Sequence, residues 1–174
     1  FFHPAQSSPM TETPIAPSKP KPQVGLFVTC PVDLVRPSIG FATATLLEQA
    51  GCEVHVPPQS CCGQIALNNG QPEGTHALAW NIVQQFDEYD YVVIPSGSCG
   101  GTIKTHYPEL FAEHDPRRQT VEAFCEKVYE LTTFLTQVLD YTPAHTALDL
   151  SAETVTYHDS CAGLRELNIK QQPR

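Results

Sequence analysis

Basic residues are scarce in this sequence, and long apolar runs are absent from it. Ten lysines and arginines stand against nineteen aspartates and glutamates, which gives a net charge of −9. An acidic chain is repelled by nucleic-acid phosphates and by anionic lipid surfaces, so we expect neither as its main partner. No apolar run comes close to the roughly eighteen residues that a transmembrane helix requires, so the sequence predicts no membrane span.

The sequence also lacks the marks of a secreted protein. Its first residues do not show a charged region followed by an apolar one, as a secretory signal does. The seven cysteines are an odd number, and their spacing is unlike that of a small disulfide scaffold. We therefore expect a cytoplasmic protein whose thiols are reduced or bound to metal.

Four of the cysteines form a pattern that is typical of a metal site. The pair Cys61-Cys62, followed by Gly63, lies between Cys30 and Cys99. Thirty residues separate Cys30 from Cys61 and thirty-six separate Cys62 from Cys99, each about the length of a strand–helix–strand unit. Because successive units of a parallel sheet return their loops to one edge, three segments are expected to bring four thiolates together. Such thiolates bind iron–sulfur clusters or zinc.

Less specific explanations of these cysteines stay open. Free cysteines are often buried as small apolar residues, although an adjacent pair in a Gln-Ser-Cys-Cys-Gly turn fills a core poorly. A disulfide between Cys61 and Cys62 is geometrically awkward. A closed four-sulfur zinc site is a further alternative, but a cluster suits adjacent cysteines better because its several irons offer neighbouring sulfurs different atoms to bind. Cys52 and Cys125 fall outside the pattern, and we expect them to be packing residues.

The hydrophobic pattern predicts an α/β layered, Rossmann-like fold with a mostly parallel sheet. Short apolar runs predict buried strands, and apolar residues at helical spacing predict helices. The expected strands are 24–28, 52–56, 91–94 and 154–157, and the expected helices are 38–50, 75–86 and 118–139, with a further helix after the glycine-rich turn 95–101. Cys30 and Cys99 each follow a strand, so both are expected at the carboxyl edge of the sheet, where such folds place their sites.

Composition divides the chain into three segments. Residues 1–23 are rich in proline, serine and threonine and are expected to be a disordered leader. Residues 24–150 are expected to form one complete module. Residues 151–174 are expected to begin a second module, because the strand-like run before Cys161 is similar to the run before Cys30.

The cysteine pattern also carries a family resemblance. Cys30, Cys61-Cys62-Gly63 and Cys99 resemble the CCG, or cysteine-rich, domain of heterodisulfide-reductase-type iron–sulfur oxidoreductases. Three surrounding segments resemble the lactate-utilisation protein A branch of this family: residues 51–54, 58–64 and 96–101. The likeness extends over roughly residues 24–174.

The resemblance implies what the cysteines hold. In the family, two CCG modules share one chain, and the cysteines of a module bind a four-iron cluster. Here that implies a [4Fe-4S] cluster on four thiolates, those of Cys30, Cys61, Cys62 and Cys99. Cys161 matches the first cysteine of a second module, which is incomplete in this sequence. The heterodisulfide-reductase form ends its module in C-x-x-C, but Thr102 stands at the last position of that motif here, so four thiolates fit better than the five of a non-cubane cluster.

Glycines next to the cysteines are expected to take part in binding the cofactor. Gly63, Gly100 and Gly101 let the backbone pass close to a bulky group. Cys99 is expected at a helix N-terminus, whose dipole favours a thiolate. The N–H groups of Gly100 and Gly101 are expected to donate to cluster sulfurs and so to tune the reduction potential.

The function that the resemblance implies is electron transfer. The chain would be one subunit of an oxidoreductase that oxidises L-lactate, inactive by itself and partnered by other iron–sulfur subunits, among them a ferredoxin-type subunit. Related family members serve glycolate oxidase, glycerol-3-phosphate dehydrogenase and heterodisulfide-reductase-like complexes. The sequence contains no flavin or nicotinamide fingerprint, so hydride chemistry is expected in a partner or at the cluster.

Two other functional classes compete with this interpretation. A cysteine hydrolase would use Cys99 in a G-x-C-x-G turn, with Asp149 and His158 following in the nucleophile–acid–histidine order. That interpretation leaves Cys30 and Cys61-Cys62 unexplained. A zinc-stabilised interaction module explains the four thiolates without redox chemistry.

Overall fold

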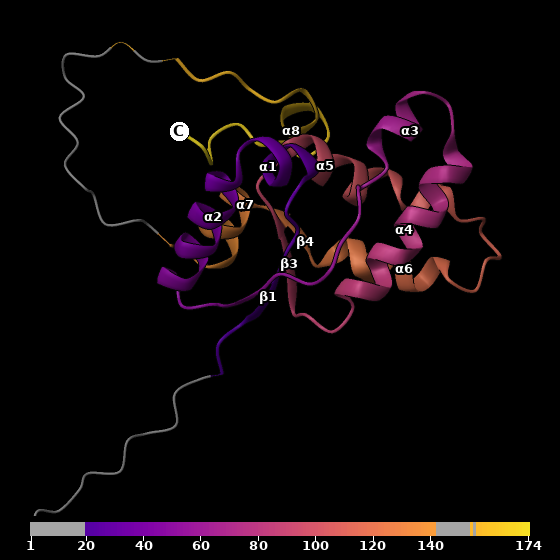
Figure 1. Cartoon of the computed structure of the whole chain (residues 1–174), viewed down its shortest axis with the longest axis horizontal. Coiled ribbons are helices and arrows are strands. Elements are labelled where there is room, and N and C mark those ends of the chain that lie inside the picture. The colour runs from indigo at the N-terminus through magenta and orange to yellow at the C-terminus, as the bar shows by residue number, and fades with distance from the viewer. Residues whose placement is uncertain (1–19, 142–153, 155) are drawn as a thin grey trace, which may run out of the picture.

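A four-stranded parallel sheet forms the centre of the molecule (Figure 1). The computed structural model describes residues 20–141, 154 and 156–174. In the sheet order β2-β1-β3-β4, every pairing is parallel. The strands are β1 (Gln23–Leu26), β2 (Glu53–His55), β3 (Tyr91–Ile94) and β4 (Val128–Glu130). The predicted α/β layered fold with a parallel sheet is therefore confirmed.

Helices connect the strands and cover both faces of the sheet. The α-helices are α1 (Cys30–Val35), α2 (Pro37–Gln49), α3 (Gln64–Asn68), α4 (Pro72–Phe86), α5 (Gly97–Gly101), α6 (Arg118–Glu126), α7 (Leu131–Thr133) and α8 (Cys161–Arg165). Two π-helical turns, η1 (Thr102–His106) and η3 (Phe134–Val138), and a 3₁₀ turn, η2 (Pro108–Leu110), complete the set of described helical segments. None of these described helices combines the length and the apolar character needed to cross a membrane.

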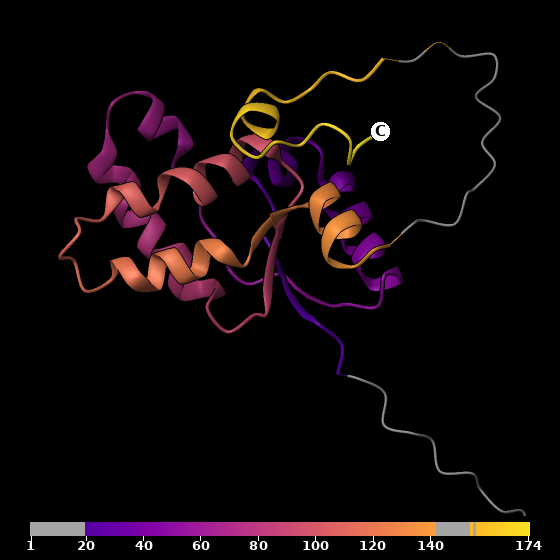
Figure 2. The same cartoon turned by 180° about the vertical axis from the view of Figure 1, so that it is seen from behind.

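The two faces of the sheet carry different cores, because successive side chains of a strand point to opposite sides. On one face, α4 and α6 pack over a cluster that includes Phe27, Val92 and Ile94. On the other, α2 and η3 pack over a cluster that includes Val24 and Leu26. We call these the α4/α6 face and the α2/η3 face. Figures 1 and 2 show the two helix layers on opposite sides of the strands.

Local sequence signals set the ends of the two longest helices. Pro37 and Pro72 lie in the first turns of α2 and α4, where proline's missing N–H removes no helical hydrogen bond. Gly51 follows α2 with φ +93°, a left-handed conformation that glycine adopts most easily. The helices predicted at 38–50 and 75–86 are confirmed, as are the first three predicted strands.

The helix predicted at 118–139 is wrong in its middle. α6 is short, β4 follows it, and helical turns resume only with α7 and η3. Val128 and Tyr129 join the sheet beside β3, because branched and aromatic side chains pack well on a sheet. Lys104 Nζ stabilises the break, since it donates to the carbonyl oxygens of Cys125 and Val128, both at 3.0 Å, where α6 ends.

The strand predicted at 154–157 is also wrong. Thr154, Thr156 and Tyr157 are exposed and belong to no strand, and residue 155 lies outside the described residues. Strand stability depends on packing against neighbouring side chains, which exposed positions such as these do not obtain.

The predicted segment boundaries fall largely outside the described part of the chain. Residues 1–19 of the predicted leader are not described, and neither is the boundary between 150 and 151. Gln23, which the sequence assigns to the leader, is the first residue of β1.

The C-terminal segment lies at the carboxyl edge of the sheet. There α8 packs against α5 through residues with small side chains (Figure 2). A Cβ placed on Gly97 would lie 2.8 Å from Ser160 Oγ and 3.0 Å from the Cα of Gly163. A Cβ on Gly101 would lie 3.0 Å from that of Ala162. Glycine at these two positions of α5 therefore allows the close contact between the helices.

Candidate metal centre

The four predicted cysteines come from three loops at the carboxyl edge of the sheet. Cys30 opens α1 after β1, Cys61 and Cys62 lie between β2 and α3, and Cys99 is the third residue of α5, after β3. The chain passes from β1 outward to β2 and then crosses to β3 on the other side of β1. Parallel α/β folds bind their ligands where the strand order reverses in this way.

The four thiols lie close enough to affect one another's acidity. The pKa of Cys62 responds to the thiols of Cys99 and Cys61, and that of Cys30 responds to those of Cys61 and Cys62. Cys62 and Cys99 are only 3% and 9% exposed, whereas Cys30 and Cys61 are half-buried. The group therefore has a protected side and a side that faces outward.

Contacts within the group set the acidity of the thiols. The hydrogen bond with Cys62 lowers the pKa of Cys99, and the same contact, together with burial, raises the pKa of Cys62. Burial raises the pKa of Cys30, and the contact with Cys61 adds to this. Contact between the two buried thiols thus favours a single negative charge on the pair.

A pocket opens beside the two half-buried cysteines. Its volume is about 290 Å³, and its lining includes Cys30, Cys61, Leu34, Val56 and Ser60. The Ser60 hydroxyl is buried and has no hydrogen-bond partner among the described residues. Thiolates, adjacent space and an unused hydrogen-bond donor together suit a sulfur-rich cofactor.

The types of residue at this edge match the ligands of sulfur-bound metals. Cysteine thiolates hold iron–sulfur clusters and structural zinc alike. In residues 20–141, 154 and 156–174, no three His, Cys, Asp or Glu side chains are grouped closely enough to hold a metal ion. By residue type, the four cysteines fit an iron–sulfur cluster, which offers a different iron to each thiolate.

The glycines near the cysteines differ from one another in their roles. Gly63 has φ +80°, and its N–H donates to Cys61 Sγ at 3.4 Å. The N–H of Gly100 donates to the carbonyl oxygen of Ser96 at 3.0 Å. Gly101 lies against α8. The roles predicted for Gly100 and Gly101 toward a cluster stay predictions, and Gly63 is a glycine whose N–H reaches a candidate ligand.

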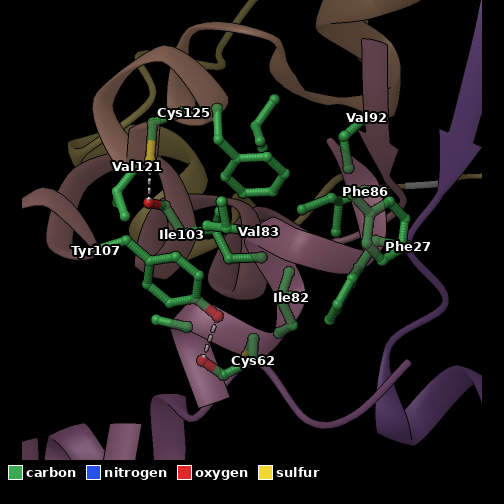
Figure 3. Close-up of a cluster of buried hydrophobic side chains, with 14 of the residues drawn as sticks. Phe27, Cys62, Ile82, Val83, Phe86, Val92, Ile103, Tyr107, Val121 and Cys125 are labelled. Carbon is green, nitrogen blue, oxygen red and sulfur yellow. Dashed lines mark hydrogen bonds between the residues drawn. The ribbon is translucent and has the colours of Figure 1, made fainter. Parts of the chain in front are cut away.

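Sequence reasoning misses two buried hydroxyl groups beside the cysteine pair. Tyr107 donates to the carbonyl oxygen of Cys62 at 2.9 Å (Figure 3), and Thr75 donates to that of Gly63 at 3.1 Å. A signal for Thr75 is present, because it lies one turn before Ala79 on the buried face of α4, where a polar side chain needs a partner. Tyr107 gives no comparable signal, since its partner lies 45 residues away.

The remaining three cysteines have different surroundings, and the predicted ligand role of Cys161 stays a prediction. Cys52 is buried in the core of the α2/η3 face and Cys125 in that of the α4/α6 face, as expected of packing residues. Cys125 Sγ donates to the Ile103 carbonyl oxygen at 3.2 Å, and burial raises the pKa of this thiol to about 12. Cys161 is exposed at the start of α8, where Ser160 accepts a hydrogen bond from the backbone and caps the helix.

The described residues do not assemble the hydrolase alternative. The pKa of Cys99 responds to Cys62 and Ser96, and no histidine is among the groups that shift it. His158 is exposed, and Asp149 lies outside the described residues. A nucleophilic cysteine needs a general base within hydrogen-bond reach, and the described residues show no histidine bonded to Cys99.

Comparison with known proteins identifies the segment that carries the four thiols. Residues 24–104 match the family described as the cysteine-rich domain, CCG. Over these residues the chain is similar to the CCG domain. The matching segment includes β1, β2 and β3 together with α5, and so contains Cys30, Cys61, Cys62 and Cys99.

Known proteins match most of the chain. The chain is 42% identical to Lactate utilization protein A of Bacillus pumilus over 152 residues and 43% identical to that of Exiguobacterium sp. over 155 residues. Each alignment covers 87% of this chain and 62% of the relative. The protein of the same name from Macrococcus caseolyticus is 42% identical, over 87% of this chain and 60% of the relative. The chain thus spans about three fifths of the length of these relatives. No solved structure matches it.

Proposed function

We propose that the segment similar to the CCG domain binds an iron–sulfur cluster, most simply [4Fe-4S], and that the protein transfers electrons in the utilisation of L-lactate. The ligands in this proposal are Cys30, Cys61, Cys62 and Cys99. The observation that carries the cofactor assignment is the convergence of four cysteines from three loops at the reversal of strand order, where Cys30, Cys62 and Cys99 each have a pKa shifted by a neighbouring thiol. The name of the relatives, Lactate utilization protein A, supports the assignment to lactate.

When bound, the cluster supplies one-electron oxidation and reduction. The residues of the chain bind it and shelter it. Cys62 and Cys99 lie on the buried side of the group, and Cys30 and Cys61 lie beside the open pocket, the side that a partner protein approaches. The N–H of Gly63 donates to Cys61 Sγ, and a donor at a ligand sulfur raises the reduction potential because it stabilises the more negative, reduced state.

Oxidation of the substrate requires more than this chain. Without a nicotinamide or flavin fingerprint, the acceptor of a hydride belongs to another subunit or to another cofactor. The chain would therefore act as an oxidoreductase subunit, inactive by itself, beside further iron–sulfur subunits that include one of ferredoxin type, in the reducing cytoplasm. The alignment leaves more than a third of each relative unmatched. We therefore also propose, rather than infer from the relatives, that this chain takes part in lactate oxidation.

Anaerobic loading with iron and sulfide tests the cofactor assignment. The chain is loaded, freed of excess metal and assayed for iron, acid-labile sulfide and zinc, together with its visible spectrum. Near-equal iron and sulfide with a brown colour is the expected result, since charge transfer from sulfur to iron absorbs visible light. Stoichiometric zinc in a colourless protein would contradict the proposal and favour the zinc module.

A matched pair of variants makes this test specific. Cys99→Ser and Cys125→Ser each replace a buried thiol of the α4/α6 core, but only Cys99 has a pKa that other thiols shift. Cys99→Ser is expected to lose the colour and the iron, and Cys125→Ser to keep both. The assignment to lactate is tested afterwards, by following lactate-dependent reduction of the loaded chain in the presence of its partner subunits, with glycolate and glycerol 3-phosphate as competing donors.

A further inference from the structure

Two buried hydroxyl groups hold successive carbonyl groups of the turn Cys61-Cys62-Gly63. Tyr107 donates to the oxygen of Cys62, and Thr75 donates to the oxygen of Gly63, at 2.9 and 3.1 Å. Tyr107 and Thr75 are both 0% exposed. The two donors come from different helical segments, α4 and the end of η1, and so fix the turn from two directions.

The environment of Tyr107 shows that its hydroxyl serves this contact. The ring is buried in an apolar cluster with Ile103 and Val121, and Figure 3 shows the hydroxyl pointing to the carbonyl of Cys62. Phenylalanine would fill such a core equally well, but a buried tyrosine hydroxyl requires a partner. Among the described residues, the carbonyl of Cys62 is the partner that it has.

Thr75 holds the neighbouring residue by packing as well as by its hydroxyl. A Cβ placed on Gly63 would lie 2.8 Å from Thr75 Cγ2, so the threonine methyl closes over the glycine. The positive φ of Gly63 and this contact both require glycine here. The hydroxyl of Thr75 also lies 3.4 Å from the carbonyl oxygen of Gln71, but its shorter bond is the one to Gly63.

We infer that Tyr107 and Thr75 are positioning residues for the cysteine pair, which they hold in its ligating arrangement before any metal binds. A backbone turn with both carbonyls fixed has few ways to rotate, so the thiols of Cys61 and Cys62 stay directed to the group that they share with Cys30 and Cys99. The role as cluster ligands rests on the proposed function. The fixing of the turn does not, because it is a property of the metal-free chain.

Alkylation of the metal-free chain tests the inference directly. Cys62 and Cys52 are both 3% exposed, but only Cys62 is next to the two hydroxyl groups. The rate at which iodoacetamide labels each cysteine, followed by peptide mass spectrometry, reports local opening at each position. In Tyr107→Phe, labelling of Cys62 is expected to rise about tenfold, the factor that corresponds to about 1.4 kcal/mol, while labelling of Cys52 stays unchanged.

Three further variants separate the hydroxyl groups from general packing. Thr75→Val is expected to raise the labelling of Cys62 as Tyr107→Phe does. Thr75→Ser, which keeps the hydroxyl but loses the methyl over Gly63, is expected to label more slowly than Thr75→Val. Tyr91→Phe removes a hydroxyl that makes no hydrogen bond among the described residues and should change neither rate. Unchanged labelling of Cys62 in both hydroxyl-deleted variants would overturn the inference. So would an equal rise at Cys62 and Cys52, which would show a loss of the fold as a whole.

A second readout connects the hydroxyl groups to the cofactor. After loading with iron and sulfide, Tyr107→Phe and Thr75→Val are expected to lose iron to a chelator about tenfold faster than the parent and Tyr91→Phe, since outer contacts of metal ligands typically change affinity by about 10–100-fold. A shift in reduction potential should accompany this change. If the parent binds no cluster, the proposed function fails while the labelling result still decides the role of the two hydroxyl groups.

Discussion

The two faces of the sheet each bury a cysteine to the same extent but surround it differently. Cys52, in the α2/η3 face, and Cys62, in the α4/α6 face, are each 3% exposed. Cys52 packs among apolar side chains such as Val24 and Leu47, and burial raises its pKa. The pKa of Cys62 instead responds to two further thiols, and its carbonyl accepts a hydrogen bond from Tyr107. Burial alone therefore does not identify a ligand; the polar partners of the cysteine do.

Exchange of these two cysteines for serine should give the largest effect. Cys62→Ser is expected to abolish iron binding, because it removes one thiolate from the proposed ligands. Cys52→Ser is expected to bind the full amount of iron. Its free energy of unfolding should fall by about 1–3 kcal/mol, because burying a hydroxyl without a hydrogen-bond partner is more costly than burying a thiol. Iron per chain and thermal unfolding measure the two effects, and equal iron in both variants would contradict the distinction.

The α4/α6 face also depends on a polar contact that shapes the sheet. Lys104→Met is expected to destabilise the protein by about 2–3 kcal/mol, because it leaves the carbonyl groups of Cys125 and Val128 without their donor. Denaturant unfolding measures the change. Lys170→Met, at an exposed lysine, is the control and should stay close to the parent; a similar small effect at Lys104 would show that water replaces its hydrogen bonds.

Two glycines test how tightly each helix layer is packed. Gly25→Ala is expected to cost about 1–3 kcal/mol, because the new methyl would lie 2.6 Å from Tyr89 and 2.7 Å from Phe86 on the α4/α6 face. Gly40→Ala, within α2, would meet Val32 at 3.4 Å, an ordinary contact, and is expected to gain up to about 1 kcal/mol of helix stability. Unfolding midpoints of the two variants should therefore move in opposite directions, and a shared direction would refute this comparison.

The smallest effect is expected on the outer surface of α2. Phe41 is 74% exposed, so Phe41→Ala removes little buried area and should change stability by less than about 0.5 kcal/mol. Denaturant unfolding under the conditions used for Gly40→Ala provides the measurement. A loss of more than about 1 kcal/mol would mean that another surface covers Phe41 in solution.

The sequence predicts an element correctly where the local pattern of residues determines it. The prediction is wrong where a contact with a distant residue determines the structure. The spacing of apolar residues from Ile39 to Leu47 is enough to predict α2. The residues from 118 to 139 have similar spacing, but Lys104, more than twenty residues upstream, supplies the donor that lets β4 interrupt the helix. No local pattern contains that information.

In the candidate site, too, some residues can be predicted from the sequence and others cannot. The spacing of Cys30, Cys61 and Cys99 predicts that three loops meet, because parallel strands share a carboxyl edge, and the structure places each cysteine on a loop or helix start at that edge. The donors that hold the turn, Tyr107 and Thr75, could not be predicted in the same way, because each acts through a hydroxyl within an otherwise ordinary helical pattern.

The central claim is that one cluster binds four thiolates, those of Cys30, Cys61, Cys62 and Cys99. Differential alkylation tests it most directly: the reactivity of every cysteine is measured by mass spectrometry before and after anaerobic loading with iron and sulfide. The account predicts strong protection of all four ligands and unchanged reactivity of Cys52 and Cys125. Unchanged reactivity of the half-buried Cys30 and Cys61 after loading would contradict it.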